Sequence, residues 1–476
     1  MRTARVQLFL MVALCAAAGH VFAAGAPASP DRPWQPASRE KKDGTWTSLE
    51  ERGTGLGASP LGLEALFGLA LSNNPSLITK WEQARAADAR SRQAEGEWFP
   101  QITSTGKFSK QRIVAHPVTG LQNQKVYGFS VEGTYKLFDF GARTARIRSA
   151  DESLRSANYD LNKAIQDVLL ETEKAYYGLD GAKAALEARY ASVKDAEKAL
   201  ESARQRFKAG IVSKLDVYQA ETEYYKALFD LEDAKESLKT AEADLLKVVG
   251  LPADTEMKVE SVPWDSRPDA LDEENVSSMV ETAIMKRPDI ASARAKYRAA
   301  ESTAKAAWGD LWPSISAGGS AGKTWYDTFA PEKSYSNEYE YTGYLKFDWN
   351  VFDGFANIAK LEEEKASARA LREQLVNAEL EASADVWSKF YAYRTSRRQM
   401  EYAESFYRSG LSSFDLALEG YNAGIKDILD LLKAQSDLSS ARSVRVQAKE
   451  NLFVAFAELV HAMGELYFST PEGEDK

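Results

Sequence analysis

Few residues in this chain could carry out covalent or metal chemistry. The sequence has one cysteine, Cys15, and three histidines, of which only His116 and His461 follow residue 23. Thiolate nucleophiles need a cysteine, and zinc sites are built largely from cysteine and histidine. The sequence also has no phosphate-binding glycine loop, no metal-ligand spacing and no nucleophile motif with a partner base. We therefore expect no enzyme activity, no metal site and no cofactor.

The charged residues with the most informative spacing lie in two segments, 206–216 and 420–430. Each has a glycine, then an isoleucine, then an aspartate six residues after the glycine: Gly210, Ile211 and Asp216, and Gly424, Ile425 and Asp430. Glycine tolerates positive φ, so we predict that each segment turns between two helices. The isoleucines then offer apolar area at a polar turn, which favours a docking surface. A simple helical hairpin is the alternative, since the same glycines satisfy it.

These two segments belong to a longer internal repeat. Gly424 lies 214 residues after Gly210, and four further pairs of landmarks follow in the same order at nearly the same offset: Asn74-Pro75 with Arg287-Pro288, Trp98-Phe99-Pro100 with Leu311-Trp312-Pro313, Leu137-Phe138-Asp139 with Val351-Phe352-Asp353, and Gly250 with Gly464. Landmarks that recur at one offset indicate a duplicated structural unit.

Each repeat has one order of elements: helix, two strands, long helix, glycine turn, helix. The first helix runs from about Leu61 to Trp98, and Asn74-Pro75 interrupts it because proline removes a backbone donor. Between Gly141 and Lys208, apolar or small residues are spaced alternately four and three apart, which is typical of a coiled-coil seam. A continuous helix of that span is roughly 100 Å long at about 1.5 Å per residue.

The strands are predicted from alternation with a period of two. In the fourth strand, residues 339–351 place tyrosine, leucine, phenylalanine and tryptophan on one face and charged or polar residues on the other. This pattern fits a strand between lipid and water, although an antiparallel sheet on a soluble core remains an alternative. The charged faces and a length of about 12 residues favour the membrane strand.

We therefore divide the chain into a series of segments: 1–23, a signal peptide; 24–60, an extended or disordered leader; 61–250, the first repeat, with strands at about 101–114 and 125–138 and a hairpin turning at 209–212; 251–273, a linker; 274–466, the second repeat, with strands at about 314–326 and 338–352 and a hairpin turning at 423–426; and 467–476, a C-terminal tail.

The signal peptide is predicted from Arg2 and Arg5, an apolar run over residues 8–18 and small residues before residue 24. Leu14 occupies the place where a lipoprotein signal needs a small residue, so we do not expect Cys15 to be lipidated. The formal net charge is −10 without a basic tract, which argues against a nucleic-acid partner.

Four strands cannot close a barrel, and unpaired edges in lipid leave backbone groups unsatisfied. If the strands span a membrane, the chain must therefore form an oligomer. Two chains supply about 8 strands and three supply about 12, and both numbers occur in membrane barrels. The residues alone do not choose between them.

Over residues 60–466 the chain resembles the TolC-type outer membrane efflux proteins. The most specific marks are the paired proline breaks at Asn74-Pro75 and Arg287-Pro288, the strand exits at 138–141 and 352–354, and the two glycine turns. The resemblance implies an α+β fold: a homotrimeric, 12-stranded membrane β-barrel with four strands per subunit. An α-helical coiled-coil tunnel continues the barrel into the periplasm.

The resemblance also implies a function and partners. Such a channel lies in the cell outer membrane and serves tripartite efflux or type I secretion, together with a periplasmic adaptor (a membrane fusion protein) and an inner-membrane pump. A soluble periplasmic coiled-coil scaffold or adaptor is the alternative. Adaptors usually carry a lipoyl-like β domain beside a helical hairpin, and we find none between Gly141 and Gly250.

By resemblance, Asp430 lies on the inward face near the periplasmic tip and forms the gate or constriction, one carboxylate per subunit. A ring of carboxylates attracts cations. The family often has a second acid where this chain has Lys433, which implies a less cation-selective gate. A solvated helix residue is the alternative role for Asp430.

Asp216, Tyr421 and Lys426 resemble the latch positions whose links between helix pairs hold the tip shut. The family more often has arginine at the position of Lys426, and lysine lacks the bidentate fork, so we expect a weaker latch. Ordinary helix packing is the alternative for Tyr421. The charges concentrate in the second turn, which predicts that the second repeat lines the gate and the first braces it. The resemblance assigns adaptor docking to the two turns: Gly210, Ile211, Gly424 and Ile425.

Overall fold

The computed structural model describes residues 60–116, 120–264, 276–329 and 333–465, together with residues 31, 266 and 268. The predicted signal peptide, nearly all of the leader and the C-terminal tail lie outside the described residues. The chain divides into two compact units. We call Met1–Gln83, Asn158–Ala291 and Asn377–Lys476 the helical unit, and Ala84–Ala157 with Ser292–Val376 the sheet unit.

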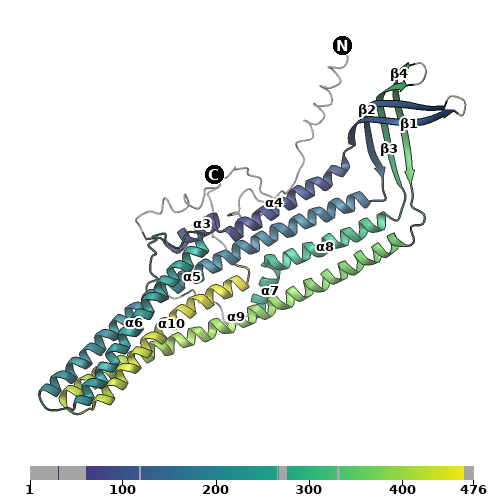
Figure 1. Cartoon of the computed structure of the whole chain (residues 1–476). Helices are drawn as coiled ribbons and strands as arrows, with labels where there is room; N and C mark the ends of the chain where they lie inside the picture. Colours follow the sequence, from purple (N-terminus) through teal and green to yellow (C-terminus); the bar gives the residue numbers. More distant parts are fainter. Residues whose placement is uncertain are drawn as a thin grey trace, which may run out of the picture. The chain divides into compact units, whose positions relative to one another are not determined.

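The order of elements that the repeat predicts is confirmed (Figure 1). The first repeat comprises α3 (Leu63–Asn73), α4 (Pro75–Glu95), the 3₁₀ helix η1 (Gly96–Trp98), β1 (Gln101–His116), β2 (Gly120–Phe138), α5 (Ala142–Lys208) and α6 (Lys214–Val249). The second comprises α7 (Val276–Lys286), α8 (Pro288–Gly309), β3 (Ser314–Phe329), β4 (Lys333–Asp348), α9 (Ala356–Ala423) and α10 (Ile428–Ala462).

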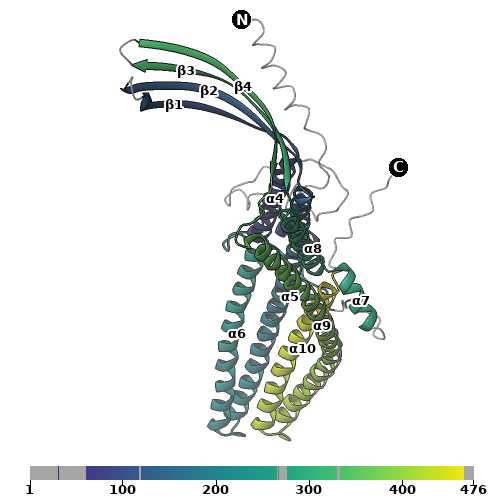
Figure 2. The same cartoon turned by 90° about the vertical axis from the view of Figure 1, so that its right-hand side faces the viewer.

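In the helical unit, two long hairpins lie side by side. Figure 2 shows the four helices as a row in the order α6, α5, α10, α9, with both turns at the same end. Buried apolar side chains from all four helices form one cluster near the turns, including Leu200, Ala220, Phe414 and Leu431. A second cluster packs α3 and the start of α4 against α5 and α6 around Leu66, Leu161 and Leu245.

The two proline breaks are equivalent corners with different side-chain chemistry. Asn74 caps α4, since its carboxamide oxygen accepts the Ser76 amide at 2.9 Å, and its nitrogen donates to the Val248 carbonyl at 2.8 Å. In the second repeat, Arg287 donates to the Ala462 carbonyl at 3.3 Å and also pairs with Asp289 and Asp385. Val248 and Ala462 are repeat equivalents, so both corners tie a helix break to the end of the repeat's last helix.

The glycines after α6 and α10 let these corners pack closely. Gly250 has φ of +80° and Gly464 of +73°, a region that favours glycine. A Cβ on Gly250 would meet the Asn73 carbonyl oxygen at 2.6 Å, and one on Gly464 would meet the Arg287 amide nitrogen at 3.1 Å. Both the positive φ and the close contact with a neighbouring backbone therefore require glycine at these two positions.

In the sheet unit, the four strands form one antiparallel sheet in the order β1-β2-β3-β4. Tyr127 pairs with Phe108 and with Trp325, and Ala321 pairs with Val131 and with Tyr341. Because side chains alternate along each strand, this register places the apolar positions of all four strands on one face. β1 and β4 are the edge strands, each paired on one side only.

That apolar face is open in a single chain. Tyr339, Tyr341, Leu345 and Phe347 on β4 are between 63% and 84% exposed. The opposite face is polar, and on it the Tyr344 hydroxyl donates to Glu132 at 3.0 Å across the sheet. The predicted division into an apolar and a charged face is confirmed.

The strand limits differ from the prediction at several ends. β1 and β2 extend to His116 and from Gly120, and β3 and β4 extend to Phe329 and from Lys333. The predicted end of the fourth strand at Phe352 is wrong, because β4 stops at Asp348. The chain leaves the strand earlier because the Asp353 carboxylate already caps α9, accepting the Asn357 amide at 3.0 Å.

The equivalent exit in the first repeat is built in the same way. The Asp139 carboxylate accepts the Arg143 amide at 2.9 Å. Two consecutive residues with positive φ precede each helix: Phe140 and Gly141, and Gly354 and Phe355. The order of phenylalanine and glycine is reversed between the repeats, so each exit holds one aromatic residue in a conformation that is costly for it.

Candidate functional site

The two glycine turns share one backbone structure. Gly210 has φ of +73° and Gly424 of +78°. In the first turn, the Gly210 amide donates to Phe207 and the Ile211 amide to Arg206, both at 2.9 Å. The second turn repeats both bonds, from Gly424 to Tyr421 at 3.0 Å and from Ile425 to Gly420 at 2.9 Å. This is the Schellman motif, in which a left-handed glycine closes the last helical turn.

The isoleucines after these glycines are exposed, as predicted. Ile211 is 63% and Ile425 is 81% exposed. Both lie beyond the end of their helix, α5 at Lys208 and α9 at Ala423. The end of the helical unit therefore presents two apolar side chains per chain.

Tyr421 is the most deeply buried of the predicted site residues. It is only 1% exposed, and the Arg206 guanidinium stacks over its ring at 4.4 Å from the ring centroid. Burial, with a smaller contribution from the Asp216 carboxylate, raises the pKa of Tyr421. Its hydroxyl has no hydrogen-bond partner among the residues that the structure describes. The ring is thus held by packing and by a cation–π contact rather than by its hydroxyl.

Lys426 and Asp430 form an ion pair within the second turn. The Lys426 ammonium lies 3.1 Å from the Asp430 carboxylate, and both side chains are about half exposed. The Asp427 carboxylate accepts the Asp430 amide at 2.8 Å and so caps α10. The predicted gate carboxylate is therefore partly neutralised by a predicted latch residue of the same chain.

Asp216 has a different partner. Its carboxylate accepts a hydrogen bond from the Ser213 hydroxyl at 2.6 Å at the start of α6. Within the described part of the chain, no ion pair joins Asp216 to Lys426. The structure thus brings Asp216 near Tyr421 and Lys426 to Asp430, as two separate pairs.

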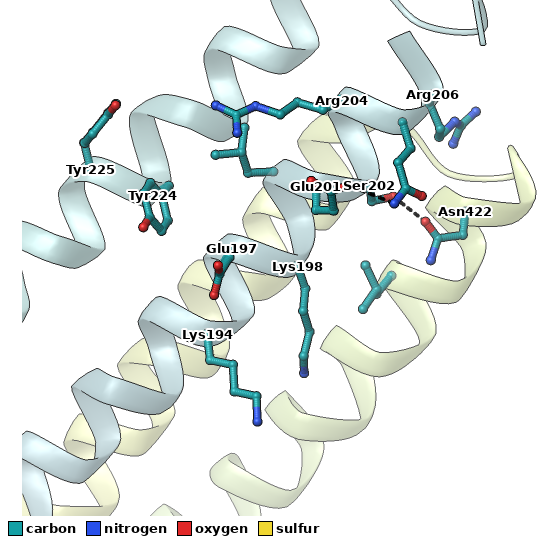
Figure 3. A pocket seen from close by; sticks show the side chains of 13 residues that line it. Lys194, Glu197, Lys198, Glu201, Ser202, Arg204, Arg206, Tyr224, Tyr225 and Asn422 are labelled. Atoms are coloured by element: carbon teal, nitrogen blue, oxygen red, sulfur yellow. Dashed lines mark hydrogen bonds between the residues drawn. The ribbon is translucent and has the colours of Figure 1, made fainter. Parts of the chain in front are cut away.

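A groove beside Tyr421 contains residues that the sequence did not point to. It has a volume of 1040 Å³ and is lined by side chains of α5, α6 and α9 (Figure 3). Ser202 of α5 donates a hydrogen bond to Asn422 of α9 across its wall. Arg206 lines the same groove, and its Nε and Nη1 have no hydrogen-bond partner in the described residues. The sequence contained one signal that could have pointed to Arg206. This residue begins the repeated segment, and Gly420 occupies its position in the second copy.

No group of histidine, cysteine, aspartate and glutamate in the described ranges could hold a metal ion. None of the helices described is both long and apolar enough to cross a membrane.

Comparison with known proteins gives a consistent result. The model of the outer membrane efflux protein family matches residues 66–251 and 279–465, one match for each repeat. Protein CyaE of Bordetella pertussis is 26% identical over 413 residues, covering 87% of this chain and 85% of that protein. The outer membrane protein TolC of Escherichia coli is 21% identical over 436 residues, covering 85% and 86%.

A solved structure of the outer-membrane channel OprN shares the fold. It superposes with a TM-score of 0.74 at 21% identity, over 85% of this chain and 90% of that one. The family places this protein in the outer membrane, with a periplasmic extension, as a channel for efflux or secretion. It thereby decides against the soluble scaffold or adaptor. The chain belongs to the outer membrane efflux protein family.

Proposed function

We propose that three copies of this chain form one channel, with the helical turns as its gated periplasmic end. The observation that carries the proposal is the sheet, which is apolar on one face and has two unpaired edges, β1 and β4. In lipid, each unpaired backbone group costs several kcal/mol. Pairing β1 of one copy with β4 of the next satisfies both edges, and a head-to-tail contact of this kind closes into a ring.

Three copies supply 12 strands and six helical hairpins. Twelve is the number of strands that the family resemblance implies, and it lies within the range of membrane barrels. Native mass spectrometry of the detergent-extracted protein tests the stoichiometry. We expect three chains per particle, and a stable monomer or dimer contradicts the proposal.

The gate is proposed to consist of Asp430 with the latch residues Tyr421, Lys426 and Asp216. Tyr421 is buried at the contact of the two hairpins, and its pKa is raised in part by Asp216. Lys426 and Asp430 place one ion pair per copy at the exposed turn. The closed tip then depends on contacts that join the second hairpin to the first, within a copy and between copies.

A pair of substitutions tests the latch. Tyr421→Phe with Lys426→Glu should raise the single-channel conductance in planar bilayers, because it reverses the latch charge and repels Asp430. The matched control is Phe207→Tyr with Val212→Glu, at the equivalent positions of the first turn, and should have little effect. An unchanged conductance in the first variant would contradict the latch role of Tyr421 and Lys426.

The exposed isoleucines support the proposal that the turns dock a periplasmic adaptor, which links the channel to an inner-membrane pump. Ile211→Asp with Ile425→Asp should abolish transport in cells while the purified channel keeps its conductance. The control is Met285→Asp, since Met285 is 79% exposed on α7, away from the turns. Equal loss of transport in both variants would argue against docking at the turns.

A further inference from the structure

The contact between α5 and α10 joins the two hairpins and carries a series of charged contacts. Starting from the corner and moving toward the turns, they are His461 with Asp167 at 2.9 Å, Lys174 with Glu458, Lys449 with Asp180 at 3.4 Å, and Arg442 with Asp195 at 2.7 Å. Each pair links one residue of the first repeat to one of the second. The part of this α5–α10 contact, or seam, that lies between the corner and the Asp195–Arg442 pair is therefore fixed by directional interactions.

Arg442 and Asp195 form the last of these pairs before the turns. Their side chains are only 13% and 9% exposed. Arg442 also donates to the Ser192 hydroxyl at 3.4 Å, and Ser192 donates to Ser439 at 3.3 Å. Lys198 contacts the second oxygen of the Asp195 carboxylate at 3.1 Å. A buried charge pair with this many partners is costly to separate.

Between this pair and the turns the seam changes character. α5 contributes Ala196, Ala199 and Ala203, each at most 1% exposed, and α10 contributes Leu431 and Leu438. Among the described residues, no hydrogen bond or ion pair joins α5 to the part of α10 from Ile428 to Leu438, and the first such bond is from Ser192 to Ser439. Apolar surfaces attract each other without a fixed direction, so this part of the seam lacks the directional bonds that hold the part beyond the pair.

A polar cavity lies beside the same pair. It has a volume of 340 Å³ and is lined by α5, α6 and α10, with Ser439 and Ser443 among its walls. A site of that size and polarity can hold water. The buried Gln435 also lines this cavity, and its side-chain oxygen has no partner in the described part of the chain. Helix α10 is thus less tightly held from this level toward the turn.

We propose that Asp195 and Arg442 form the pivot of the gate. In this proposal, which rests on the proposed function, opening moves only the turn end of the second hairpin, which in α10 runs from Ile428 to Leu438, roughly 15 Å at about 1.5 Å per residue. The charged seam above the pivot stays closed. Asp195 and Arg442 are positioning residues, because they set which part of the second hairpin moves without lining the constriction.

Two engineered disulfides on either side of the moving segment test the pivot. Cys15 is the only native cysteine. In the latch variant Tyr421→Phe/Lys426→Glu, one pair is Ser202→Cys with Asn422→Cys, whose side chains touch near the turn. The other is Ser192→Cys with Ser439→Cys, whose hydroxyls lie 3.3 Å apart at the pivot. Single-channel conductance is measured before and after oxidation, and again after reduction.

We expect the pair near the turn to return the oxidised channel to its low resting conductance, and reduction to restore the high one. The pair at the pivot should change conductance less than about 1.2-fold, since that level does not move. If both disulfides close the channel, the seam moves along its whole length. That result contradicts the pivot but leaves the proposed gate supported. If neither does, the hairpins do not separate at the turn and the pivot is again overturned.

A charge substitution separates positioning from general stability. With Asp195→Asn, movement should extend above the pivot, so the Ser192→Cys/Ser439→Cys disulfide should now lower conductance on oxidation. Asp195→Glu should keep that disulfide without effect. If the disulfide has the same effect with and without Asp195→Asn, the pivot is overturned. A latch variant that never raises conductance would instead remove the proposed gate itself, so the two failures are distinguishable.

Discussion

The α5–α6 hairpin and the α9–α10 hairpin have the same turn and different surroundings. Both turns close on a left-handed glycine with the same pair of backbone bonds. Yet Phe207 in the first is 43% exposed, whereas its repeat equivalent Tyr421 is 1% exposed beneath Arg206. The glycines thus preserve the backbone of the duplicated unit, and the side chains around them give the two copies different burial and contacts.

The charges at the turns differ in the same sense. The first turn has Val212 and Ser213 where the second has Lys426 and Asp427. In the first, Ser213 bonds to a side chain. In the second, Asp427 bonds to the backbone of α10 and Lys426 pairs with Asp430. The second turn is therefore the better capped and the more charged, which fits its proposed place at the gate.

The largest expected difference between the hairpins concerns pH. Burial raises the pKa of Glu173 on α5 to about 7, although a hydrogen bond with Tyr177 acts to lower this pKa. Its repeat equivalent on α9 is Trp387, which does not titrate. The folded chain binds this proton more tightly than the unfolded chain, whose value is 4.5. The stabilisation that this group contributes is therefore fully present below about pH 4.5 and is lost as pH rises through about 7.

The change corresponds to about 3 kcal/mol at about 1.36 kcal/mol per pKa unit. Thermal unfolding followed by circular dichroism between pH 4.5 and 7.5 measures it. Glu173→Gln should remove most of this slope, and Trp387→Phe should leave it unchanged. A wild-type midpoint that stays constant over the range is the result that contradicts the assignment.

The next effect concerns the arginine that covers Tyr421. Arg206→Ala removes a cation–π contact worth about 0.5–2 kcal/mol, so the open population should rise roughly 2- to 30-fold. Arg206→Lys keeps the charge but loses the planar stack, and should lie between wild type and alanine. Open probability in planar bilayers measures both. If the lysine variant matches the alanine variant, the planar stack matters and the charge does not.

The elements of this fold were predictable because glycine and proline act locally. Gly210 and Gly424 mark both turns, and Pro75 and Pro288 mark both helix breaks, each through its own backbone preference. The two faces of the sheet followed from alternation. The end of β4 did not, because Asp353 acts as the cap of α9, and a cap cannot be told from a strand-end residue by alternation alone.

The site residues were less accessible from the sequence. The resemblance indicated Tyr421, Lys426 and Asp430, which lie near one another along the chain. Arg206 and the Asp195–Arg442 pair were missed, since they depend on contacts between the repeats. Asp195 and Arg442 are separated by 247 residues. Neither spacing nor residue type signals that a charge on one helix will meet its partner on another hairpin.

A smaller difference is expected from the caps. Asp427→Ala removes a side-chain cap, which costs about 1 kcal/mol of helix stability. Ser213→Ala should cost less, because the Ser213 side chain makes no bond to the backbone of α6. Hydrogen exchange of the amides in the first helical turn of α10 and of α6 distinguishes the two variants. We expect Asp427→Ala to accelerate exchange in α10 more than Ser213→Ala accelerates it in α6. Equal acceleration in both variants would show that the turns are capped alike.

The smallest expected effect concerns the charge at the proposed constriction. An exposed ion pair contributes about 0.2–1 kcal/mol, so Lys426 should weaken cation binding at Asp430 by a factor of roughly 1.5 to 5. Lys426→Gln should then strengthen channel block by divalent cations, and Asp430→Asn should abolish it. The matched first-turn variant Asp216→Asn should leave block unchanged, since Asp216 faces Ser213.

This last measurement separates two explanations of the second turn. If Lys426 acts only as a latch, its removal changes conductance and leaves the apparent affinity for the blocking cation unaltered. If it also neutralises Asp430, as the 3.1 Å pair implies, affinity and conductance change together. Block in the double variant Lys426→Gln/Asp430→Asn is the control, because a cation that still blocks that channel must bind at a place other than Asp430.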